Sequence, residues 1–80
     1  MLDLSAGSSH LYPGARLRVI SGDGSDAVIR FADGTSARAE VSGDRLAVEA
    51  HVTGAGTRIG AKVWRLTPED DGYRVKAREV

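Results

Sequence analysis

Hydrophobic and polar residues alternate along most of the chain from residue 15 onward, and short glycine–aspartate segments interrupt this alternation. Alternation with a period of two is typical of β-strands that are buried on one face. Glycine and aspartate favour tight turns, because glycine adopts positive φ angles readily and the aspartate side chain binds nearby backbone amides. The interruptions lie at residues 22–24, 33–34, 43–44, 54–56 and 68–72. This spacing predicts an all-β fold and leaves no uninterrupted window for a helix.

The turns divide the chain into six predicted strands, at residues 15–20, 26–32, 35–42, 45–52, 57–66 and 73–80. We expect a six-stranded antiparallel meander, in which each strand pairs with the next. The apolar residues are mostly alanine and valine, and such small inner residues favour a sheet that curls into a small up-and-down barrel. Residues 1–14 are predicted to be an irregular N-terminal segment, with a short edge strand around Leu2 and Leu4 as the alternative. Residues 15–80 are predicted to be a single β-meander domain.

Turn geometry determines the expected register of neighbouring strands. A three-residue loop at 32–34 places Gly34 in the left-handed position of a G1 bulge, so that Ile29 lies opposite Ala37. The same reasoning gives four further pairs: Val41 with Leu46, Val48 with Val63, Ala50 with Ala61, and Val52 with Ile59. The predicted inner face comprises Leu17, Val19, Ala27, Ile29, Phe31, Ala37, Ala39, Val41, Leu46, Val48, Ala50, Val52, Ile59, Ala61, Val63, Tyr73, Val75 and Ala77.

The outer face of the predicted sheet carries every lysine and arginine except Arg65. Trp64 has the same parity, beside Lys62 and opposite Arg74, and a tryptophan among cations stacks on bases or other rings. One hypothesis is therefore a binding site for anionic ligands, single-stranded nucleic acid among them. Its residues are Trp64, Lys62, Arg58, Arg74 and Lys76. The alternatives are a solvated polar face without a ligand, and a β-bulge at Gly60 that turns Trp64 into the core.

Length and charge narrow the classes of function. Eighty residues make one small domain, and small domains often gain stability by oligomerising, so a homodimer is one expectation. The formal net charge is zero, which as a bulk property does not favour nucleic acid. The absence of cysteine excludes disulfides and thiolate metal sites. Without a basic, apolar leader or an apolar window of about 20 residues, we expect a cytoplasmic protein with no membrane partner, although a mature secreted chain would look the same.

Catalytic chemistry has weak support in the sequence. Ser36, His51 and Glu49 share the predicted outer face, which admits a small hydrolase as a third hypothesis. A catalytic triad also needs a buried acid and an oxyanion hole, and the pattern supplies neither. Two histidines at unrelated positions, without cysteine, predict neither a metal site nor a cofactor. The leading hypothesis is a non-enzymatic β-domain that serves as a protein-binding or self-association module.

Overall fold

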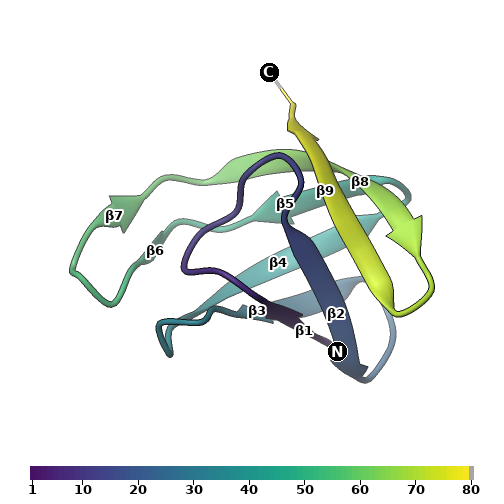
Figure 1. The fold of residues 1–80 in the computed structure, drawn as a ribbon, viewed down its shortest axis with the longest axis horizontal. Coiled ribbons are helices and arrows are strands. Elements are labelled where there is room, and N and C mark those ends of the chain that lie inside the picture. Colours follow the sequence, from purple (N-terminus) through teal and green to yellow (C-terminus); the bar gives the residue numbers. More distant parts are fainter. Residues whose placement is uncertain (80) are drawn as a thin grey trace.

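The computed structural model describes residues 1–79 and contains nine β-strands (Figure 1). Their bounds are β1 Leu2–Ala6, β2 Arg16–Ser21, β3 Asp26–Arg30, β4 Ser36–Ser42, β5 Arg45–Val48, β6 His51–Val52, β7 Arg58–Ile59, β8 Lys62–Glu69 and β9 Gly72–Arg78. Within the described residues there is no helix long and apolar enough to cross a membrane. The last residue of the predicted strand 73–80 lies outside this description.

Seven of the strands close into a barrel in the order β1-β2-β9-β8-β5-β4-β3. β1 completes the barrel, because it pairs antiparallel with β2 and parallel with β3. The prediction of a small all-β barrel is confirmed, with seven strands in place of six. Closure gives each barrel strand a neighbour on both sides, and it removes the exposed edges that promote aggregation.

The N-terminal strand corrects the predicted topology. Part of the segment predicted to be irregular, 1–14, is β1, and its side chains Leu2, Leu4 and Ala6 are buried. β1 lies between β2 and β3, so these two strands do not pair as a meander requires, and the parallel β1–β3 pair departs from a purely up-and-down barrel. Three alternating apolar positions are a weak signal alone. Their burial depends on the two strand edges between which β1 inserts.

The hairpin of β3 and β4 has the predicted register, and the ladder between β4 and β5 also agrees with the prediction. Ile29 lies opposite Ala37, and the N–H of Phe31 donates to the carbonyl of Thr35 over 2.8 Å. Gly34 has a φ angle of 88°, which confirms the left-handed position in the three-residue loop. Glycine is the residue that adopts this conformation without a steric penalty.

The predicted register is wrong by one residue along the hairpin that contains β6, β7 and β8, and Ile59 lies opposite His51 and not Val52. Val48 lies opposite Lys62, whereas the sequence pattern pairs Val48 with Val63. A shift of one residue exchanges the two faces of a strand. Trp64 is therefore in the core, with 7% of its surface exposed, and the prediction of an outward-facing Trp64 is wrong. The alternative that places Trp64 in the core is correct in outcome but not in cause, because the β5–β8 and β6–β7 ladders keep one register on both sides of Gly60.

The core consists of aliphatic side chains together with one tryptophan and one phenylalanine. Its buried members are Leu2, Leu4, Ala6, Ala15, Leu17, Ala27, Ile29, Phe31, Ala37, Ala39, Leu46, Val48, Trp64, Leu66 and Val75. Five residues predicted to face inward are instead exposed: Val19, Ala50, Val52, Ala61 and Ala77. Val19 lies beyond the end of the β2–β9 ladder, and an irregular register between β8 and β9 turns Ala77 outward. The other three lie where the chain leaves the barrel.

Candidate binding site at the barrel mouth

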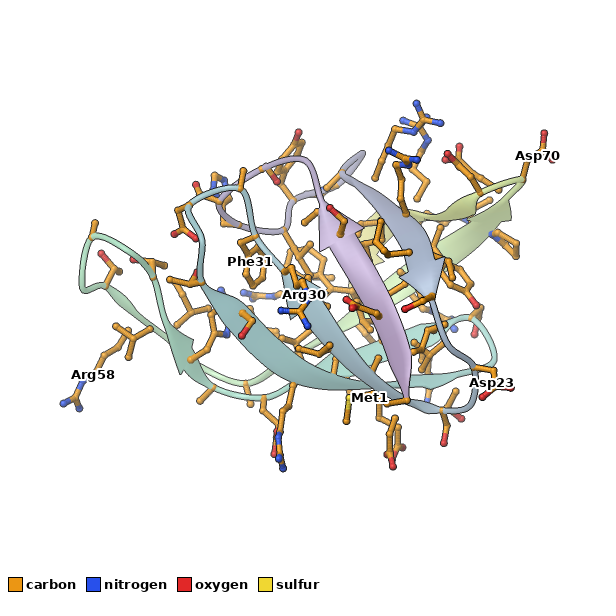
Figure 2. All side chains as sticks on the ribbon, turned by 90° about the horizontal axis from the view of Figure 1, so that it is seen from below. Met1, Asp23, Arg30, Phe31, Arg58 and Asp70 are labelled. Atoms are coloured by element: carbon orange, nitrogen blue, oxygen red, sulfur yellow. The ribbon has the colours of Figure 1, made fainter. Side chains whose placement is uncertain are left out.

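β6 and β7 form a separate two-stranded sheet, and with their flanking residues they make up an arm, residues 49–61. Figure 1 shows the arm extending away from the barrel, and Figure 2 shows Arg58 at its outer end. Residues 49–50 and 60–61 are not in strands, so the ladder of β5 and β8 is interrupted before that of β6 and β7 begins. Among the described residues, β6 and β7 have no strand partner other than each other.

The Asp33 carboxylate joins the arm to the β3–β4 turn. Its Oδ2 accepts the N–H of Gly54 in the arm over 2.9 Å, and its Oδ1 accepts the N–H and the hydroxyl of Thr35 over 3.0 and 2.5 Å. These bonds favour the ionised form, so the Thr35 hydroxyl first, and the Gly54 amide next, lower the pKa of Asp33 to about 2. The arm is thus held at its outer end by one ionised side chain.

The end of the barrel that faces the arm contains a pocket of about 150 Å³, here named the mouth pocket. Its lining residues are His10, Leu11, Phe31, Val48, His51, Ile59, Gly60, Lys62 and Trp64. The rings of Phe31 and His51 stack with centroids 5.3 Å apart and planes at 12°. Figure 2 shows Phe31 within the molecule, whereas the neighbouring Arg30 lies on the surface. The pocket therefore joins side chains of the barrel, the arm and the N-terminal loop.

The His51 ring is oriented by its own backbone neighbourhood. Its Nδ1 lies 3.0 Å from the Glu49 carbonyl oxygen, and a carbonyl only accepts, so Nδ1 carries the hydrogen. The bond and the stacking on Phe31 together define the ring plane. His51 thus provides a flat wall of the pocket. Its Nδ1–H is bonded to the Glu49 carbonyl, so this group is not free to bind a ligand.

The loop between β1 and β2, residues 7–15, covers the other side of the mouth. The N–H of Ala32 donates to the Ser8 carbonyl over 3.0 Å, and the N–H of Gly14 donates to the Val75 carbonyl over 2.7 Å. These bonds fix both ends of the loop to the barrel. Between them Leu11 is partly buried against the core, so the loop has an apolar contact at the pocket.

Lys62 lies where the mouth pocket meets a wider groove of about 930 Å³ on the outer surface. The side chain is half-buried and forms no ion pair among the described residues. The groove carries charges of both signs: Asp26, Arg38, Glu40, Glu49, Arg78 and Glu79. It therefore presents no uniform charge to a partner, whereas Lys62 is the only lysine or arginine that lines the mouth pocket.

The structure does not gather the five predicted ligand-binding residues on one face. Trp64 and Lys62 line the mouth pocket, whereas Arg58 lies on the arm and Lys76 at the irregular part of β9. Arg74 pairs with Thr67 near the other end of β8 and not with Trp64, which lies opposite Arg78. The predicted proximity of Trp64 and Arg74 is therefore wrong.

Most of the arginines on the outer surface have acidic partners. Six of them form ion pairs: Arg16, Arg18, Arg30, Arg45, Arg65 and Arg74. The bond from Arg45 to Glu79 is 2.7 Å and that from Arg74 to Glu69 is 2.8 Å. Acidic side chains therefore neutralise much of the surface that the sequence pattern predicts to be basic. Exposed pairs of this kind keep the surface solvated and contribute little stability each.

The residues of the hydrolase hypothesis do not form a triad. Ser36 lies opposite Arg30 on β3, and His51 donates to the Glu49 backbone and not to its carboxylate. No side-chain hydrogen bond links Ser36, His51 and Glu49 in the part of the chain that the structure describes. Across residues 1–79, no three His, Cys, Asp or Glu side chains lie close enough to hold a metal ion.

Sequence reasoning missed the mouth pocket because its lining comes from six parts of the chain: the β1–β2 loop, the residue after β3, and β5, β6, β7 and β8. Phe31 was predicted to be an inner residue, but its stacking on His51 joins positions twenty residues apart and has no local signature. Leu11 and His10 lie in the loop predicted to be irregular. The sequence signal nearest to the pocket was the apolar pattern of residues 50–61, of which Ala50, Val52 and Ala61 are exposed in the structure.

Comparison of the chain with protein-family models, with curated proteins and with solved structures gives no match. The function is therefore inferred from the arm, the mouth pocket and their chemistry.

Proposed function

We propose that this protein is a non-enzymatic binding module whose arm pairs with another protein chain, a second copy of itself in the first instance. One observation carries the proposal: in the described part of the chain β6 and β7 pair only with each other, while the barrel strands are closed into a ring. Open strand edges are templates for strand addition, in which main-chain hydrogen bonds supply affinity. The arm is thus the place on this small barrel where a partner strand fits.

The side chains of the arm support association. Val52 is 51% exposed, and Ala50, Ala55 and Ala61 are also exposed, so the arm offers apolar surface. Within residues 49–61 the only charged side chains at neutral pH are Glu49 and Arg58, which cancel. A second copy is therefore not repelled by like charge. Small barrels with lean cores also gain stability from such contacts.

Analytical ultracentrifugation over a wide concentration range tests the proposal. We expect the wild-type chain to self-associate reversibly and Val52→Asp to remain monomeric, because the aspartate places a charge in the new interface. Ile20→Asp is the matched control, since Ile20 on β2 is 54% exposed and lies outside the arm. Dissociation by Ile20→Asp but not by Val52→Asp would place the interface on β2. A wild-type chain that is monomeric throughout would contradict self-association through the arm.

A second candidate function, binding of an anionic ligand, is supported by Lys62, which lies beside Trp64 in the mouth pocket and has no ion-pair partner among residues 1–79. A broad nucleic-acid face has less support, because Trp64 is buried and the surface arginines are largely paired. Retention on a heparin column tests for a broad nucleic-acid-binding face. A small ligand bound at the pocket leaves heparin retention weak, whereas a nucleic-acid face produces strong retention that decreases steeply with salt.

A further inference from the structure

We infer that the mouth pocket binds a small aromatic carboxylate with a single ring, its ring among the apolar walls and its carboxylate against the Lys62 ammonium. The pocket shares His51 and Ile59 with the arm, but it uses their side chains, whereas strand pairing uses the backbone edges of β6 and β7. It also differs from a general basic surface, because its recognition depends on one cavity and one cation.

The size and lining of the pocket favour a single planar ring. A cavity of about 150 Å³ accepts a benzene-sized molecule. The stacked Phe31–His51 pair and the Trp64 indole are flat, and aromatic rings pack favourably in stacked or edge-to-face arrangements. Leu11, Val48 and Ile59 supply aliphatic contacts. Two fused rings or a long alkyl chain would exceed this volume.

The charge of the pocket favours an anion. Lys62 is half-buried beside apolar walls, and an ammonium in such a setting attracts an opposite charge more strongly than one in bulk water. It has no carboxylate partner among residues 1–79. The Nδ1–H of His51 is occupied by the Glu49 carbonyl, and the Lys62 ammonium lines the pocket as a cationic donor for a charge-assisted hydrogen bond.

The position of Lys62 also limits the free-energy cost of removing water from the carboxylate of the ligand. A carboxylate buried fully in an apolar cavity would be unstable without compensation. Lys62 lies at the boundary between the mouth pocket and the open outer groove. A ligand whose ring occupies the pocket therefore keeps its carboxylate at the rim, where the ammonium and water both reach it.

Titration with benzoate and with benzamide tests the inference, because the two probes share shape and size but differ in charge. Binding is followed by Trp64 fluorescence and by the amide chemical shift of Gly60, both of which lie at the pocket. We expect saturable binding of both probes, with benzoate favoured by about tenfold, the value of one hydrogen bond to a charged group. In Lys62→Met this preference should disappear, while benzamide binding remains.

The chain provides a matched control in its other lysine. Lys76→Met removes the same charge at an exposed position on β9 outside the pocket, and it should leave the benzoate preference unchanged. If Lys62→Met and Lys76→Met lost the preference for benzoate equally, the preference would reflect only the net charge of the protein, and the inference would be overturned. An absence of saturable benzoate binding to the wild type would also overturn it. Benzoate binding that persists in Val52→Asp would show that the pocket operates without the association surface of the arm.

Discussion

The barrel and the arm share one pattern of alternating apolar residues, but only the barrel buries it. Val48 and Val52 lie four residues apart in one predicted strand, with the same parity and the same side chain. In the structure Val48 is 5% exposed and belongs to the core, whereas Val52 is 51% exposed. An alternating pattern therefore predicts pairing of strands, and burial requires in addition a layer of other strands opposite the apolar face.

The boundary between the two regions has a structural cause. β5 has a neighbour on each side up to Val48, namely β4 and β8. The N–H of Glu49 still donates to the Arg38 carbonyl, but none of residues 50–79 pairs with β4. The hairpin then continues with only its own two strands. A two-stranded hairpin is marginal alone, so the arm needs the Asp33 contact, the barrel mouth or a partner to hold it.

The sharpest test of this contrast replaces the two valines by aspartate. Val48→Asp should unfold the barrel or destabilise it by at least about 3 kcal/mol, because it places an unpaired charge in the core. Val52→Asp should change the free energy of unfolding of the monomer by no more than about 0.5 kcal/mol, as exposed positions usually do. The variants are therefore compared at a protein concentration at which the wild type is monomeric. Urea denaturation followed by Trp64 fluorescence measures both. Similar losses for the two variants would mean that the arm is part of the cooperative core.

Two glycines extend the comparison from side chains to backbone. A Cβ at Gly72, where β9 begins, would overlap the Leu17 carbonyl oxygen on β2, whereas a Cβ at Gly60 in the arm meets no atom within 4 Å. We expect Gly72→Ala to cost about 2–3 kcal/mol, because backbone atoms must move apart. Gly60→Ala should stay within about 0.5 kcal/mol of the wild type. Thermal melts followed by circular dichroism distinguish them, and a larger loss at Gly60 would contradict the view of a tightly packed barrel and an open arm.

Much of the fold was predictable because short turns transmit register. The loop at 32–34 and the turn at 43–44 determine which residues face each other in two hairpins, and both predictions hold. The connection from β5 to β8 includes the arm, and the loop at 53–57 determines the register there. The N–H of Thr53 donates to the Thr57 carbonyl, and the same register continues through His51–Ile59 to Val48–Lys62. The prediction was wrong by one residue at this loop, which exchanged the faces of β8 and placed Trp64 outside the core. β1 was not predicted as a barrel strand, because the long loop 7–15 separates it from β2 and its other partner, β3, is not its neighbour in the sequence.

The candidate site was less predictable than the fold. Lys62 and Trp64 were named from the sequence, but as neighbours on an outer surface. They meet at the mouth pocket because the shifted register turns both toward the barrel interior. The remaining walls come from a loop and from the arm, and their approach depends on contacts such as the Asp33–Gly54 bond. Contacts between turns leave no periodic pattern in the sequence, so they cannot be predicted from it.

The smallest expected effect concerns the hydrogen bond from the Gly54 amide to the Asp33 carboxylate. Lowering the pH should weaken this bond in the arm before it affects the barrel. The pKa of Asp33 is lowered from its ordinary value of 3.8 to about 2, so its contribution is fully present above pH 3.8 and is lost as the pH falls through about 2. Over this interval the Gly54 amide should lose hydrogen-exchange protection and shift in the NMR spectrum, while the Ile29 amide in β3 remains protected. Asp33→Asn, which keeps an acceptor oxygen but does not titrate, should abolish the pH dependence at Gly54. If Gly54 and Ile29 lost protection together in the wild type, the arm would open only when the barrel unfolds, and the two regions would be one cooperative unit.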